Sequence, residues 1–135
     1  LDSMCFIYHF ADHPQYSRLT NQIFQFLETG KIKAVTSMIS VIESLVLPEK
    51  KNDQLICYEY EKVFQGYPNM RILPVDWGIS RLTAKLRAKY QFLRTPGAIQ
   101  ISSGLISGCS LFVTNDKKLE KVKETAVAIL DNYVG

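Results

Sequence analysis

Short apolar stretches with strand character alternate with amphipathic helix patterns along the chain, and this alternation restricts the fold more than any other feature. Strand patterns are expected at residues 32–37, 70–75, 111–113 and 127–130, with helix patterns between them. Strands joined by helical crossovers run parallel, and helices then cover both faces of their sheet. The sequence therefore predicts an α/β protein with a central parallel sheet.

The size and composition of the chain predict one globular domain spanning residues 1–135. Its 47% hydrophobic residues can fill one core, and a second domain would be cramped. The longest apolar runs fall far short of the ~20 residues that span a bilayer, and no export signal is recognisable. We expect a cytoplasmic protein with no membrane segment. Three widely spaced cysteines, Cys5, Cys57 and Cys109, suit reduced core thiols.

Capping residues, prolines and glycines predict where the helices begin and end. Asp2 or Ser3 is expected to cap a first helix that runs to about Phe10, and Gly30 ends a second helix. A third helix is expected at residues 41–47, because Pro48 stops it. Further helices are expected at residues 53–65, at residues 76–90 after a capping Asp76, from Pro96 onward and, briefly, from about Lys117.

Three acids are expected at the same place in the predicted topology, beyond the carboxyl ends of the strands. Asp2, Glu43 and Asp116 each lie just after the carboxyl end of a strand, or within about a turn of it, where functional groups gather in open parallel sheets. Carboxylates without histidine or cysteine partners favour hard cations such as Mg²⁺ or Mn²⁺. Taken singly, Asp2 and Asp116 are also good helix caps, and Glu43 is also an ordinary helical residue. Only their common place at the carboxyl ends of the strands favours a metal site.

Four stretches in order along the chain carry a resemblance to a known family. They are LDSMCFIY at residues 1–8, TSMISVIE at 36–43, PGAIQ at 96–100 and LFVTND at 111–116. Together they resemble the successive motifs of PIN-domain ribonucleases, including VapC-type toxins, over nearly the whole chain. Each motif is weak alone, and the ordered set with matching spacing is fairly specific.

The resemblance implies a three-layer α/β/α PIN-like fold and a divalent-metal-dependent endoribonuclease that uses Mg²⁺ or Mn²⁺. By motif position, Asp2, Glu43 and Asp116 would be the catalytic and metal-binding acids. The residues that would support them are Ser3, Thr114 and Asn115. The implied partners are RNA and an antitoxin protein, and a homodimer is an assembly often found in the family.

Gly97 departs from the family pattern, which has aspartate after this proline. One acid fewer lowers the formal charge of the site from about −4 to about −3 and should weaken metal binding. We expect impaired or absent activity in this chain. Two origins for Gly97 stay open: natural degeneration into a non-catalytic module, or a substitution selected or introduced because an active nuclease harms its host. Gln100, one turn later, could offer a neutral oxygen, although a surface or capping role is the simpler interpretation.

The basic residues Arg81, Lys85 and Lys89 recur at helical spacing on one helix and could contact RNA phosphates. A solvated basic face is the commoner explanation of such a stripe. The net charge of +3 favours a polyanionic partner only slightly.

Two other functions are compatible with the sequence. One is a PIN-like module that holds RNA or protein without cleaving it. The other is a relative of flap nucleases acting on DNA, which the small size of the chain disfavours.

Overall fold

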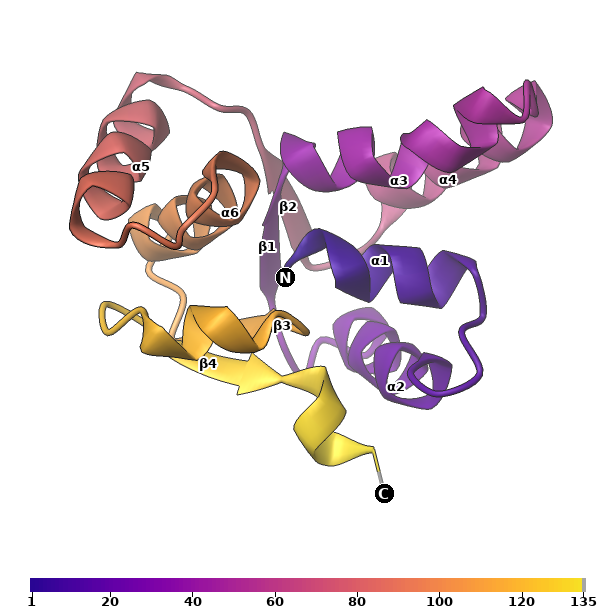
Figure 1. Ribbon diagram of the computed structural model, residues 1–135. Helices are drawn as coiled ribbons and strands as arrows, with labels where there is room; N and C mark the ends of the chain where they lie inside the picture. The colour runs from indigo at the N-terminus through magenta and orange to yellow at the C-terminus, as the bar shows by residue number, and fades with distance from the viewer. Residues whose placement is uncertain (135) are drawn as a thin grey trace.

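Helices and short strands alternate along residues 1–134, the part of the chain that the computed structural model describes (Figure 1). Two of the helices, η1 and η2, are 3₁₀ helices. The elements follow in the order α1 (Ser3–Phe10), α2 (Ser17–Glu28), β1 (Ala34–Ser37), α3 (Met38–Lys50), α4 (Gln54–Gly66), β2 (Met70–Leu73), α5 (Trp77–Lys89), α6 (Thr95–Ile106), β3 (Leu111–Thr114), η1 (Lys117–Lys121), β4 (Ala126–Ile129) and η2 (Leu130–Tyr133). This order confirms the predicted alternation.

The four strands form two parallel pairs. β1 pairs with β2 in the register Ala34↔Met70, and β3 pairs with β4 in the register Leu111↔Ala126. Residues 1 and 2 connect the pairs: the amino nitrogen of Leu1 donates to the β1 carbonyl of Val35 at 2.7 Å, and the amide of Asp2 donates to the β3 carbonyl of Val113 at 2.9 Å. The strands are parallel within each pair, as predicted, and the hydrogen bonds of Leu1 and Asp2 connect the two pairs.

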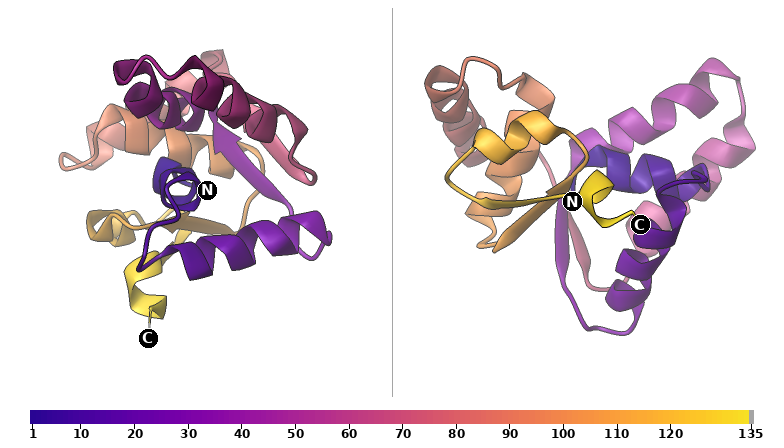
Figure 2. Two further views of the ribbon diagram at one scale, coloured as in Figure 1. Left: turned by 90° about the vertical axis from the view of Figure 1, so that its right-hand side faces the viewer. Right: turned by 60° about the horizontal axis from the view of Figure 1, so that its bottom comes forward.

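Helices cover this layer from two sides. α5 packs on α6, and α6 contacts both β1 and β3. On the other side α1 packs on α2 and α3, and α3 packs on α4. Figure 1 and the right-hand view of Figure 2 show the strands between these two groups of helices. The arrangement confirms the three-layer α/β/α fold class, because each group buries its apolar face against the strands.

Each helical layer has its own apolar core. On the α1–α2 side the ring of Phe6 lies 5.4 Å from that of Phe24 and 4.9 Å from that of Phe64. Aromatic pairs at such distances contribute about 0.5–1.5 kcal/mol each beyond their area burial. On the α6 side the buried cluster comprises Leu86, Leu93, Ala98, Ile101, Phe112, Leu119 and Val122. The two cores hold the carboxyl ends of β1 and β3 in fixed places.

The third helix differs from the prediction. α3 begins directly after β1, where the side chain of Ser37 caps it by accepting from the amide of Ile39 at 3.1 Å, and it continues through Pro48 to Lys50. Proline removes one helical hydrogen bond, but here the carbonyl of Pro48 still accepts from the amide of Asp53 and the ring is buried. Burial and the bonds that remain therefore carry the helix past the expected stop.

Two strands, β1 and β2, are shorter than their sequence patterns. β1 begins at Ala34 and not at Ile32, and β2 ends at Leu73, directly before Pro74, which cannot donate to a ladder. The described residues include no helix with the length and apolar character needed to cross a bilayer. Cys5, Cys57 and Cys109 are free thiols, as expected.

Candidate active site

Asp2 lies at the start of α1, where its carboxylate is held from two directions. Its Oδ1 accepts from the amide of Ser3 at 2.8 Å, which caps the helix, and its Oδ2 accepts from the hydroxyl of Thr114 at 2.6 Å. Burial raises the pKa of Asp2 above its ordinary value, and the nearby charge of Asp116 adds to this, whereas the bonds from Thr114 and Ser3 oppose it. The carboxylate is thus oriented by α1 and β3 in a poorly solvated place.

Asp116 follows β3 and is joined to Asp2 through Thr114. The amide of Asp116 donates to the Thr114 hydroxyl at 3.1 Å, and that hydroxyl in turn donates to Asp2. The Asp116 carboxylate is exposed and caps η1 by accepting from the amide of Lys118 at 3.1 Å. Asp116 therefore occupies the predicted end of a buried strand and also serves as a cap.

Glu43 reaches the same place from α3. Its Oε1 accepts from the hydroxyl of buried Ser3 at 2.6 Å, while the rest of the residue is exposed. Ser3 thus contacts Asp2 through its amide and Glu43 through its side chain. The structure brings the three predicted acids into one hydrogen-bonded series, in the order Glu43, Ser3, Asp2, Thr114 and Asp116, which we call the acid network.

Gln100 lies behind Ser3 at the centre of a buried neutral cluster. Its side-chain amide donates to the hydroxyls of Ser3 at 3.1 Å and Ser40 at 2.8 Å. Its carbonyl oxygen accepts from the amide of Ser37 at 3.2 Å and lies 3.4 Å from the hydroxyl oxygen of Thr36. We call Gln100 with Thr36, Ser37 and Ser40 the Gln100 network.

The surface or capping role expected for Gln100 is wrong, because the residue is only 3% exposed. Both amide hydrogens of its side chain have partners, Ser3 and Ser40, and its carbonyl oxygen accepts from the amide of Ser37. The carbonyl oxygen is accordingly committed to the protein, which argues against its use as a metal ligand.

Thr36 and Ser40 are site residues that the sequence reasoning missed. Their hydroxyls lie 2.6 Å apart, and that of Thr36 also donates to the backbone carbonyl of Leu1 at 2.8 Å. The available signal was two small polar residues four apart, bracketing a strand-to-helix junction in a stretch that otherwise belongs to the core. Such residues in a buried motif need partners, and the partner here is a glutamine sixty residues away in sequence.

Gly97 lies in the first turn of α6, one turn before Gln100. That turn holds no acidic residue, and its N-cap residue, Arg94, makes no side-chain capping bond. A Cβ atom at position 97 would meet only side-chain carbons of Leu119 and Leu93, at 3.9 Å and 4.0 Å, which is ordinary contact. Neither space nor a left-handed backbone angle requires glycine there. A methyl group would therefore fit at position 97.

The residues present do not form a complete site for a divalent ion. Within residues 1–134, no three aspartate, glutamate, histidine or cysteine side chains come together in an arrangement that could hold a metal. The oxygen chemistry of Asp2, Glu43 and Asp116 suits Mg²⁺ or Mn²⁺. However, each of these carboxylates already accepts a hydrogen bond from the protein.

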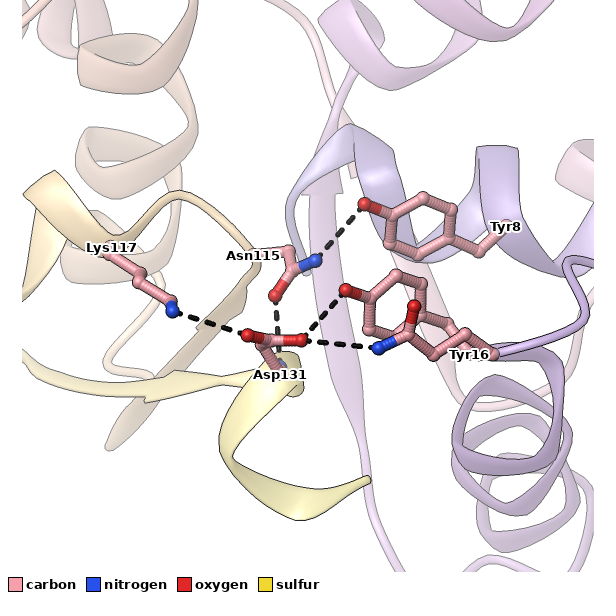
Figure 3. Close-up of polar contacts among 6 residues, drawn as sticks. Tyr8, Tyr16, Asn115, Lys117 and Asp131 are labelled. Carbon is pink, nitrogen blue, oxygen red and sulfur yellow. Dashed lines mark hydrogen bonds and ion pairs between the residues drawn. The ribbon is translucent and has the colours of Figure 1, made fainter. Parts of the chain in front are cut away.

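Asn115 makes its hydrogen bonds toward the carboxyl-terminal part of the described chain. Its side-chain amide donates to the hydroxyl of Tyr8 at 3.1 Å, and its side-chain oxygen accepts from the amide of Asp131 at 2.9 Å (Figure 3). The Asp131 carboxylate also accepts from Tyr16 at 2.8 Å and pairs with Lys117 at 3.2 Å. Asn115 therefore fastens the end of β3 to η2 and α1, and it supports the position of Asp116 only through the backbone.

The basic stripe Arg81, Lys85 and Lys89 lies exposed on α5. The ammonium group of Lys89 already pairs with the carboxylate of Glu124 at 2.9 Å, and the Tyr90 hydroxyl donates to the same carboxylate at 2.6 Å. Arg81 and Lys85 line a shallow hollow with Gly78, Leu82 and Ala84. Arg81 and Lys85 are consequently freer than Lys89 to bind a phosphate.

Comparisons with known proteins agree on one family. The family model described as PIN domain matches residues 1–125. Among solved structures, the crystal structure of VapBC2 from Rickettsia felis bound to a promoter DNA fragment is similar, with a TM-score of 0.73, 13% identity and 94% of each chain covered. A toxin–antitoxin complex from Klebsiella pneumoniae gives a TM-score of 0.67 at 19% identity, covering 96% of this chain and 94% of the other. No curated protein sequence matches the chain.

Proposed function

Because the chain belongs to the PIN domain family, we propose that it is an endoribonuclease of the toxin class whose catalytic centre is impaired or inactive in its present form. The observation that carries the proposal is the acid network, in which Asp2, Glu43 and Asp116 meet from three separate segments. Such a constellation at strand ends suits the Mg²⁺- or Mn²⁺-dependent cleavage of a phosphodiester. The impairment is the missing side chain at position 97.

The acid network assigns separate tasks to its members. Asp2, Glu43 and Asp116 are the proposed catalytic and metal-binding acids. Ser3 and Thr114 orient them, since each hydroxyl donates to one carboxylate and the amide of Ser3 donates to Asp2. A raised pKa at Asp2 shows that the ionised form is poorly compensated, which is the condition a nearby cation would relieve. We propose that an acid at position 97 completes this compensation.

Restoring the acid tests the proposal. In an RNA cleavage assay with Mn²⁺, Gly97→Asp should raise the cleavage rate at least 10–100-fold over the unchanged chain. Gly97→Asn, which has the same size without the charge, should give no such gain. Adding Asp116→Asn to the Gly97→Asp variant should abolish the gain. A blank result for Gly97→Asp across varied RNAs would contradict the nuclease assignment, and equal cleavage by the unchanged chain would contradict the impairment.

A second candidate is a PIN-like module that binds RNA or protein without cleaving. It is favoured by the incomplete ligand set and by the commitment of Gln100 to the protein. Titration with Mn²⁺, followed by electron paramagnetic resonance, separates the two. Weak binding that Asp2→Asn removes supports a residual nuclease site, whereas no specific binding in either the unchanged chain or Gly97→Asp supports the module.

We also propose an antitoxin protein as partner, since the solved structures similar to this chain are toxin–antitoxin complexes. A homodimer is the second assembly to examine. Light scattering on protein purified from its own host distinguishes the states. A persistently monomeric protein without a bound partner would contradict both assignments.

A further inference from the structure

Trp77, the single tryptophan of the chain, lies almost entirely in solvent in the first turn of α5. The residue is 82% exposed, and no basic side chain of residues 1–134 lies over its indole ring. Val75 and Ile106, whose side chain lies next to Gly78, are 42% and 51% exposed. Tryptophan is on average a strongly buried residue. An open indole beside other exposed apolar side chains therefore indicates a binding surface.

Basic residues continue from Trp77 along the same face of α5. Arg81 and Lys85 follow at the spacing of one and two turns, about 6 Å and 12 Å farther along the helix axis. No acid stands between Trp77 and Lys89, and within residues 1–134 neither Arg81 nor Lys85 forms an ion pair. The carboxylate of Asp76 is used to cap α5. Like charges at this spacing repel each other, so a negatively charged partner would stabilise this face.

The surface around these side chains is open enough for a flat group. Arg81 and Lys85 share a shallow hollow with Gly78, Leu82 and Ala84. Gly78 and Ala84 are exposed and carry no long side chain. A planar ring can therefore approach the helix beside the indole without displacing other residues. We call Trp77, Arg81 and Lys85 the Trp77 face.

The Trp77 face begins at the same edge of the strand layer as the acid network. β1 and β2 are parallel, and Ser37 lies opposite Leu73 at their carboxyl ends. Glu43 follows the first strand in α3, and Trp77 follows the second at the start of α5. Figure 1 shows α3 and the connection to α5 leaving the same end of this strand pair. An RNA strand that lies along this edge can meet both.

We propose that the Trp77 face binds single-stranded RNA, with an unpaired base stacked on the indole and neighbouring phosphates against Arg81 and Lys85. The identity of the ligand as RNA rests on the proposed nuclease function, whereas the preference for an unpaired strand follows from the indole. In a duplex the bases are stacked on each other, and proteins meet mostly phosphates and 2′-hydroxyl groups. A single strand offers base faces and phosphates together, which suits an aromatic ring followed by two cations.

A second copy of this chain suits the Trp77 face less well. A two-fold symmetric dimer uses the same surface patch on both subunits. Arg81 and Lys85 of one copy would then lie against the same two cations of the other, and like charges brought together in an interface are unfavourable. The charge of the face therefore favours a polyanion as its occupant.

Trp77 reports on its own occupancy, because it is the one source of tryptophan fluorescence in the chain. Titration with a short single-stranded RNA of mixed sequence, in the presence of a chelator, should quench this fluorescence. Trp77→Ala should weaken binding about 5–150-fold, the range for one stacked base, in an anisotropy assay with labelled RNA. Trp77→Phe should keep most of the affinity, and Trp77→Leu should not. An RNA duplex should bind equally to the unchanged chain and to Trp77→Ala.

Two controls separate stacking from general effects of substitution. Tyr58 is a second exposed aromatic residue, 58% exposed on α4 with the ammonium group of Lys62 over its ring, and Tyr58→Ala should leave RNA affinity unchanged. The thermal midpoint of Trp77→Ala should equal that of the unchanged chain, because the residue is mostly exposed. Arg81→Gln should reduce the salt slope of binding by about 0.7, the value for one phosphate contact on a single strand.

Each contrary result has a distinct meaning. Unquenched fluorescence on binding, or equal affinities of Trp77→Ala and Tyr58→Ala, would overturn the proposal. Equal losses for duplex and single-stranded RNA would overturn the preference for an unpaired strand. A fluorescence change that follows protein concentration and not RNA would assign the face to a second copy.

The cleavage assay with Gly97→Asp separates this inference from the proposed function. Cleavage by Gly97→Asp, with binding and rate unaffected by an added Trp77→Ala, would contradict the Trp77 face and support the nuclease. RNA binding that requires Trp77, in a chain that does not cleave even as Gly97→Asp, would support the Trp77 face and contradict the nuclease.

Discussion

The acid network and the Gln100 network meet at the hydroxyl of Ser3, which accepts from Gln100 and donates to Glu43, yet they are built in opposite ways. In the Gln100 network every member is neutral and buried, and the central amide both donates and accepts hydrogen bonds within the protein. In the acid network three acids are joined only through Ser3 and Thr114, the pKa of Asp2 is raised by burial, and no acid stands at position 97. One network is satisfied by the protein alone, and the other is not.

This difference indicates which part of the centre serves the fold and which part serves function. A buried network of hydrogen-bonded polar groups stabilises one arrangement of α1, α3, β1 and α6. Each broken hydrogen bond would leave a buried polar group without a partner. Clustered carboxylates reduce stability and are usually retained for chemistry. The two networks should therefore respond oppositely to substitution.

The largest effect is expected at Gln100. Gln100→Ala removes the partner of the Ser37 amide and of the hydroxyls of Ser3 and Ser40, so the free energy of unfolding should fall by about 3 kcal/mol. Urea unfolding measures it. The control is Gln22→Ala on the exposed face of α2, which should change stability by less than about 0.5 kcal/mol. Equal losses at the two positions would remove the distinction between the networks.

Substitution of Asp2 should change the free energy of unfolding in the opposite direction at neutral pH. Because burial raises its pKa in the folded state, Asp2 contributes stability below its ordinary pKa of 3.8, and this contribution is lost as the pH rises through the raised value. Asp2→Asn cannot titrate, so its stability relative to the unchanged chain should increase from acid to neutral pH. The effect should be smaller than that at Gln100, because Thr114 and Ser3 partly compensate the charge.

Urea unfolding of both proteins at several pH values, with a chelator present to exclude bound ions, measures this difference. A difference that does not change with pH, or that decreases toward neutral pH, would show that Asp2 is well compensated. The acid network would then be compensated by the protein alone, as the Gln100 network is.

A smaller gain is expected at Gly97. Gly97→Ala should stabilise the protein by about 0.5–1 kcal/mol, because alanine favours the helix and reduces the freedom of the unfolded chain. The added Cβ meets only Leu119 and Leu93 at ordinary distances. Thermal unfolding is the measurement. A loss of stability would mean that glycine is needed for packing.

The smallest effect concerns RNA binding by α5. If the basic stripe contacts phosphates, Lys85→Gln should reduce the slope of binding affinity against salt by about 0.7, the value for one phosphate contact on a single strand. Lys89→Gln should reduce it less, because Lys89 already pairs with Glu124. Fluorescence anisotropy with a single-stranded RNA measures both slopes. Unchanged salt slopes would show that the basic stripe is a solvated surface. The stripe would then not hold RNA for the acid network.

Two of the candidate acids could be placed from the sequence because Asp116 comes after β3 and Glu43 lies in the helix that follows β1. Asp2, Glu43 and Asp116 stood out by topology, and the structure links them through Ser3 and Thr114 as neighbours. Gln100 did not stand out, because a single glutamine on a helix looks like a surface residue. Its partners are Ser3, Thr36, Ser37 and Ser40, which lie 60 to 97 positions away along the chain.

Local patterns determined the order of helices and strands, the caps at Asp2, Asp53, Asp76 and Asp116, and the absence of an acid at position 97. These features depend on neighbouring residues, so the sequence alone suffices for them. Only the tertiary structure decided that Pro48 stays within α3, that Gln100 is buried and hydrogen-bonded in the core, and that a cavity separates β1 from β3. Those outcomes depend on packing between distant segments, where burial and hydrogen bonding override local preference.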